Sequence, residues 1–131
     1  VNHNIETIER LYRTARPGGR YNRALALLEH AKHSHPEIPT KSGIMVGLGE
    51  TLSEIETTLS DLRNVGCDIV TIGQYLRPSL AHLPVTRYYT PGEFDEFAFK
   101  ARKLGFRHVE SGPLVRSSYH AQEQSQALSA S

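Results

Sequence analysis

Two helix-start signals, each placed after a short hydrophobic run, limit the folds open to this chain. Thr51 and Glu54 have the spacing of a capping box, in which two side chains accept hydrogen bonds from each other's backbone N–H groups. Thr90 and Glu93 repeat the spacing, with a proline at the first helical position. The run over 69–72 carries no charge, which is typical of a strand that a parallel sheet buries on both faces. The chain is therefore expected to consist of βα units.

The remaining periodicity continues this pattern. Apolar residues at helical spacing predict helices over 5–16, 21–33, 51–65 and 90–104. Asn4 is expected to be the N-cap of the first helix. Strands are predicted over 40–46, 68–74 and 106–110, and the residues after 121 are expected to be frayed. This order predicts an α/β fold with parallel strands and right-handed crossovers.

Composition excludes several classes of function. The chain has 131 residues, and its 15 basic and 14 acidic residues give a net charge of +1, so overall charge favours neither nucleic acid nor membrane as a partner. The longest apolar run is far shorter than the roughly 20 residues of a membrane span. One cysteine excludes an internal disulfide and suits a reducing, cytosol-like compartment. Because it begins a predicted strand, Cys67 is expected to be a small buried residue.

Polar or glycine-rich segments follow several predicted strand ends. They are 4–6, 47–50 and 74–77. Ligands gather at the carboxyl ends of the strands in parallel α/β proteins, so these segments are expected to share one binding rim. A second candidate is the polar segment 116–121, Arg-Ser-Ser-Tyr-His-Ala, which is poor core material. It is either a ligand-binding segment or a Ser/Thr turn.

These stretches together resemble a known family. Four stretches occur in the order found in the C-terminal half of lipoyl synthases. They are Asn-His-Asn-Ile-Glu-Thr over 2–7, Lys-Ser-Gly-Ile-Met-Val-Gly-Leu-Gly-Glu over 41–50, Thr-Ile-Gly-Gln-Tyr-Leu-Arg-Pro over 71–78 and the segment 116–121. Lipoyl synthases are radical S-adenosylmethionine enzymes. The resemblance implies the second half of a partial (β/α)6 barrel, with helices on its outer face, over residues 1–110. Residues 111–131 would be a C-terminal extension.

The resemblance also implies a set of residues that bind S-adenosylmethionine. They are Asn2, Asn4, Glu6, Arg16, Lys41, Gly47, Glu50, Gln74, Tyr75 and Leu76. Met45 stands where the superfamily pattern G-x-I-x-G-x-x-E usually has isoleucine. Purely structural roles stay open for several of these residues: Asn4 and Glu6 suit a helix start, Arg16 suits a solvated helix end, and the glycines suit an ordinary turn.

Iron–sulfur chemistry is implied only in part. The family has two [4Fe–4S] clusters, and the auxiliary cluster takes a serine ligand from the Arg-Ser-Ser-Tyr motif. That role falls to Ser117, with Ser118 as the alternative. The cysteine triads of both clusters are missing, and the chain opens on Val1, so we expect part of an enzyme whose N-terminal half is absent. The isolated chain is expected to be inactive.

For the complete enzyme the resemblance implies sulfur insertion at C6 and C8 of an octanoyl group. The octanoyl group is amide-linked to a lysine of a lipoyl-carrier protein or lipoyl domain, and the 5′-deoxyadenosyl radical abstracts the hydrogens. The expected location is the cytoplasm, or the mitochondrial matrix or plastid of a eukaryote. The alternative is a non-catalytic half-barrel that binds a nucleotide-like ligand or a cysteine-bearing partner chain. A biotin synthase is a third hypothesis, which the Arg-Ser-Ser-Tyr-His ending disfavours.

Overall fold

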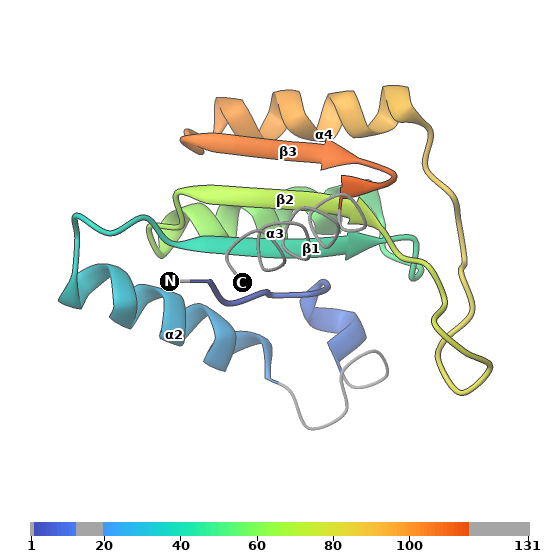
Figure 1. The fold of residues 1–131 in the computed structure, drawn as a ribbon, viewed down its shortest axis with the longest axis horizontal. Coiled ribbons are helices and arrows are strands. Elements are labelled where there is room, and N and C mark those ends of the chain that lie inside the picture. The colour runs from blue at the N-terminus through green and yellow to red at the C-terminus, as the bar shows by residue number, and fades with distance from the viewer. Residues whose placement is uncertain (1, 13–19, 116–131) are drawn as a thin grey trace, which may run out of the picture.

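The computed structural model describes residues 2–12 and 20–115 (Figure 1). The helical elements are η1 (Glu9–Leu11), α2 (Tyr21–Ser34), α3 (Leu52–Asn64) and α4 (Pro91–Lys103). The strands are β1 (Lys41–Val46), β2 (Ile69–Gln74) and β3 (His108–Gly112). Each predicted strand and the last three predicted helices are present, with ends shifted by a few residues at most.

The strands form one parallel sheet in the order β1-β2-β3. Lys41 is in register with Ile69, which is in register with His108. The strand arrows in Figure 1 point the same way, so their carboxyl ends share one edge of the sheet. This confirms the predicted α/β architecture, and it is consistent with half of a partial barrel.

Both predicted capping boxes are present. Thr51 Oγ1 accepts from the N–H of Glu54 and Thr90 Oγ1 accepts from the N–H of Glu93, while both glutamates accept from the capping residues' N–H groups. Gly66, after α3, has a φ of 83°, as expected of a helix-ending glycine. These local signals fix where the helices after β1 and β2 begin and where α3 ends.

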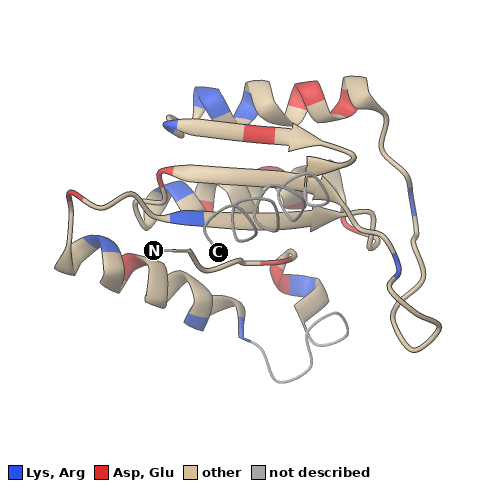
Figure 2. Ribbon diagram, in the orientation of Figure 1, with Lys and Arg blue, Asp and Glu red and all other residues tan. Residues whose placement is uncertain are grey.

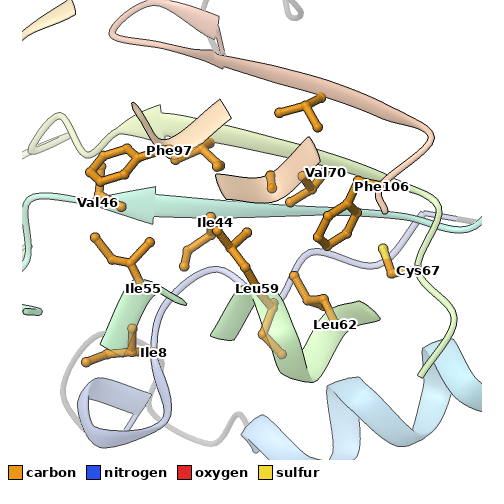
Figure 3. Close-up of a cluster of buried hydrophobic side chains, with 14 of the residues drawn as sticks. Ile8, Ile44, Val46, Ile55, Leu59, Leu62, Cys67, Val70, Phe97 and Phe106 are labelled. Carbon is orange, nitrogen blue, oxygen red and sulfur yellow. The ribbon is translucent and has the colours of Figure 1, made fainter. Parts of the chain in front are cut away.

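The core lies between one face of the sheet and the helices. Ile44, Val46, Val70, Ile72 and Val109 are buried on that face. Helix α3 covers them with Ile55, Leu59 and Leu62, and α4 adds Phe97 (Figure 3). Phe94 and Ala101 of α4 belong to the same buried cluster. Burying one such aliphatic or aromatic side chain stabilises the fold by about 1.5–3 kcal/mol, so this layer contributes strongly to stability.

Residues 2–8 correct one prediction, because they do not begin a helix. The segment lies along β1, with isolated parallel bridges from Asn2 to Lys41 and from Glu6 to Ile44. The N–H of His3 donates to Lys41 O at 3.0 Å, and that of Glu6 to Gly43 O at 2.9 Å. Asn4 is therefore not an N-cap, and the only helical turn before Tyr12 in the described residues is η1. Pairing with the exposed edge of β1 is favoured over the predicted helix, because the unpaired N–H and C=O groups of a strand edge need hydrogen-bond partners.

Among the described residues, no helix is long and apolar enough to cross a membrane. Lys and Arg are spread over the helices and connections, interspersed with Asp and Glu (Figure 2). The connection between β2 and α4 differs, because residues 75–90 include Arg77 and Arg87 but no acidic residue.

Candidate functional site at the carboxyl ends of the strands

A glycine turn follows β1 at the carboxyl edge of the sheet. Gly47 and Gly49 have φ angles of 110° and 109°, which side-chain-bearing residues rarely adopt. The carboxylate of Glu50 folds back on this turn and accepts from the N–H of Gly47 at 2.9 and 3.1 Å and of Leu48 at 3.1 Å. Glu50 is buried, so these backbone donors replace the water that a carboxylate normally requires.

Gln74, the last residue of β2, joins the turn to the connection before α4. Its Nε2 donates to the carbonyls of Tyr75 at 3.1 Å and Arg87 at 2.9 Å, and its Oε1 accepts from the N–H of Tyr89 at 3.0 Å. The N–H of Thr86 donates to Gly47 O at 2.8 Å. The connection is therefore held against the strand ends by backbone and amide groups.

Tyr89 completes this arrangement. Its hydroxyl donates to Oε2 of Glu50 at 2.8 Å, and the Arg87 guanidinium carbon lies 4.4 Å from its ring centroid. The Phe97 ring meets the Tyr89 ring edge-on at 5.3 Å. Burial raises the pKa of the Tyr89 hydroxyl, and the neighbouring Glu50 carboxylate raises it further, so the hydroxyl stays a proton donor.

The sheet face away from the helices carries polar side chains. On this face Gly43 lies between Asn4 and Thr71: a Cβ on Gly43 would be 2.7 Å from Thr71 Oγ1 and 3.0 Å from Asn4 Oδ1. Thr71 is in register with Glu110 of β3. We call these residues (Asn4, Gly43, Thr71 and Glu110) the polar row. The missing side chain of Gly43 allows the amide and the hydroxyl to approach each other.

Glu6 lies where the first segment leaves β1. Its φ of 74° is the only positive value of a non-glycine residue in the described chain. Four positions separate Asn2 from Glu6 while their partners, Lys41 and Ile44, are three positions apart, so the segment contains one extra residue, like a bulge. Such strained residues cluster at functional sites.

The structure brings some predicted site residues together and separates others. Gly47, Glu50 and Gln74 meet at the rim, with buried Tyr75 and half-exposed Leu76 beside them. Asn2 and Lys41 lie at the amino end of β1, about 20 Å from Gly47 at the usual rise of a strand. Arg16, Ser117 and Ser118 lie outside the described residues. Binding of S-adenosylmethionine by these residues stays a prediction.

Sequence reasoning misses Thr71 and Tyr89 as individual site residues. Thr71 lies within an uncharged run that suggests burial, although alternation along a strand puts it on the face opposite Val70 and Ile72. Tyr89 stands 39 positions from Glu50, and nothing in their spacing signals the contact. The alternation could have identified Thr71; no local signal could have identified Tyr89.

Metal ligands are not gathered in the described part of the chain: it has no group of three or more His, Cys, Asp or Glu residues that could hold an ion. Cys67 is fully buried, as predicted. Burial raises the pKa of its thiol to about 11, which disfavours the thiolate that binds metals.

The fold and the rim define an α/β domain of parallel βα units with its candidate site at the strands' carboxyl ends. Comparison with known proteins narrows this class of protein to one family, although no family model matches the chain. Lipoyl synthase of Nitrosococcus oceani is 59% identical over 94% of the chain, and lipoyl synthase of Thioalkalivibrio sulfidiphilus is 58% identical over 97%. Lipoyl synthase 2 of a Nostoc species is 58% identical over 94%.

The chain is homologous to the C-terminal part of the lipoyl synthases, and the predicted resemblance is confirmed. It spans 38–41% of the length of these relatives. The alternative of a non-catalytic module gains no support from them.

Proposed function

We propose that this chain is the part of a lipoyl synthase that binds S-adenosylmethionine along its rim and polar row. The observation that carries the proposal is the identity of 58–60% to lipoyl synthases over nearly the whole chain. The geometry agrees with it, because the glycine turn, Glu50 and Gln74 meet at the carboxyl ends of the strands, where parallel α/β folds bind ligands.

The polar row and the rim offer groups that S-adenosylmethionine requires. Asn4 and Thr71 offer an amide and a hydroxyl to ribose hydroxyls, and Glu6 offers a carboxylate to the cofactor's ammonium group. The turn after β1 and the backbone of Tyr75 and Leu76 suit a flat base. Lys41 and Asn2, at the amino end of β1, would contact only a ligand that extends deep along the sheet.

The described residues do not fit an iron–sulfur cluster, because a cluster needs several thiolates and Cys67 is buried. The cluster thiolates must therefore come from outside the described residues. Ser117, with Ser118 as the alternative, remains the proposed serine ligand of the auxiliary cluster. Arg16 remains a proposed partner of the cofactor's carboxylate.

The complete enzyme would insert sulfur at C6 and C8 of an octanoyl group on a carrier-protein lysine. Bound S-adenosylmethionine and reduced [4Fe–4S] would supply the radical chemistry that the side chains of this chain lack. The chain's own residues would bind and orient the cofactor. After iron–sulfur reconstitution, the isolated chain is expected to release no 5′-deoxyadenosine, whereas the full-length enzyme releases it.

Titration of S-adenosylmethionine into a full-length lipoyl synthase with this chain as its C-terminal part tests the proposal. Thr71→Val keeps the side-chain shape and removes the hydroxyl, so the Kd should rise about fivefold to tenfold. Thr57→Val is the matched control, because Thr57 is exposed on α3 and its hydroxyl bonds within the helix, to Ser53 O. A wild-type protein that does not bind S-adenosylmethionine would refute the proposed function.

A further inference from the structure

Tyr89 and Glu50 form a buried contact between two loops of the rim. Glu50 accepts hydrogen bonds from three donors: the N–H of Gly47, the N–H of Leu48 and the hydroxyl of Tyr89. Both residues are at most 8% exposed. The carboxylate therefore has its hydrogen-bonding capacity met largely within the protein.

The connection before α4 is also attached to the same turn at one further point and to the end of β2. Thr86 donates its N–H to Gly47 O, and Gln74 binds the backbone of Arg87 and Tyr89 on either side of Tyr88. The Arg87 side chain covers the Tyr89 ring and pairs with Glu93 on α4. The turn and the connection are thus joined into one unit, which includes the start of α4.

This arrangement leaves the side chains of Glu50 and Gln74 little capacity for a ligand. Gln74 has both amide atoms bonded to backbone groups. The loss of a hydrogen-bond donor from a buried carboxylate costs free energy. Without the Tyr89 hydroxyl, Glu50 would therefore move toward another donor or toward water. The turn, whose N–H groups Glu50 holds, would move with it.

We propose that Tyr89 is a positioning residue of the cofactor site, which acts through Glu50 to hold the Gly47–Gly49 turn in its binding conformation. The inference rests on the proposed function, and it assigns Glu50 and Gln74 to the support of the site. The cofactor would meet the backbone that they hold.

The test uses full-length lipoyl synthase with this chain as its C-terminal part, reconstituted with iron and sulfide. Tyr89→Phe removes the hydroxyl and keeps the ring, so the Kd and KM for S-adenosylmethionine should rise about tenfold. The kcat at saturating S-adenosylmethionine and the KM for an octanoyl-lysyl peptide should stay within twofold of wild type. Global destabilisation would instead lower kcat by reducing the active fraction.

Tyr88→Phe is the matched control. Tyr88 is adjacent to Tyr89 and 68% exposed, so removing its hydroxyl should leave all these constants unchanged. Glu50→Gln gives a second route if Tyr89→Phe folds poorly: it should raise the KM similarly, and the double variant should not exceed the larger single effect. An unchanged S-adenosylmethionine KM in Tyr89→Phe, or additive effects in the double variant, would overturn the inference. Absence of binding by the wild type would refute the proposed function instead.

Discussion

Gln74 occupies the space that a side chain on Gly47 would need. A Cβ built on Gly47 overlaps the Gln74 amide nitrogen and lies 2.6 Å from the Arg87 carbonyl oxygen. The glycine is therefore required twice, by its φ of 110° and by the closeness of the next strand end. This contact joins the turn after β1, the end of β2 and the connection to α4.

Gly47→Ala and Gly49→Ala should differ in cost although their φ angles are nearly equal, 110° and 109°. Both replacements strain the backbone by about 1–2 kcal/mol. The nearest contact of a Cβ on Gly49 is Thr86 Oγ1 at 3.8 Å, so only Gly47→Ala adds overlap, which costs about 1–3 kcal/mol more. Urea unfolding measures both variants. Equal losses of stability would contradict the close approach of Gln74.

Glu6→Gly should be more stable than Glu6→Ala by about 1 kcal/mol, the reverse of the order at an ordinary helical position. The reason is the φ of 74°, which glycine adopts without strain. Comparing these two variants cancels any interaction of the lost carboxylate. Thermal unfolding gives the order, and cofactor titration should find both variants equally weakened. An alanine variant as stable as the glycine variant would contradict strain at this residue.

The ion pair of Arg10 with Glu54 predicts a pH dependence of stability. Arg10 donates to both carboxylate oxygens, at 2.8 and 2.9 Å, and this pairing, together with the N–H of Thr51, holds the pKa of Glu54 at about 2. The pKa is lower in the folded state, so the stabilisation is complete above the unfolded pKa of about 4.3 and is lost as pH falls toward 2. Since Arg10 is half-exposed, solvent screens the pair and its contribution to stability is small.

Glu54→Gln tests this, because glutamine preserves the capping box and removes the charge. The free energy of unfolding of the wild type should slightly exceed that of the variant at pH 7 in low salt, and the difference should disappear near pH 2. A difference that persists unchanged at pH 2 would mean that packing, and not the ion pair, is responsible.

Cys67 should resist alkylation in the folded protein. Its thiol is fully buried and its pKa is raised to about 11, so very little reactive thiolate is present at pH 8. A thiol reagent should react at least about 100-fold more slowly without denaturant than in 6 M urea. Similar rates in both conditions would show that the start of β2 opens readily.

Local signals predicted the βα units well. Each capping box pairs a threonine with a glutamate three residues later, and both lie at observed helix starts. The run from Ile69 to Ile72 is the central strand of the sheet. These predictions succeeded because the interactions that decide them act within a few residues.

Residues 5–8 show where local reasoning fails. The spacing of Ile5 and Ile8 fits a helix, and both residues are buried as a helix would require. The backbone nevertheless bonds to β1. Its partner groups on that edge need hydrogen bonds but are distant in sequence, so no local pattern could predict the pairing.

The sequence by itself determined the order of strands and helices, the helix caps and the family relationship, since each is written in neighbouring residues or short motifs. Only the tertiary structure decided that Asn4 lies beside Gly43 and that Glu50 is held by Tyr89. Those contacts join segments 39 positions apart in sequence. The first forms because residues 2–6 pair along the edge of β1, and the second because parallel strands bring their carboxyl ends together, where buried polar groups must find partners within the protein.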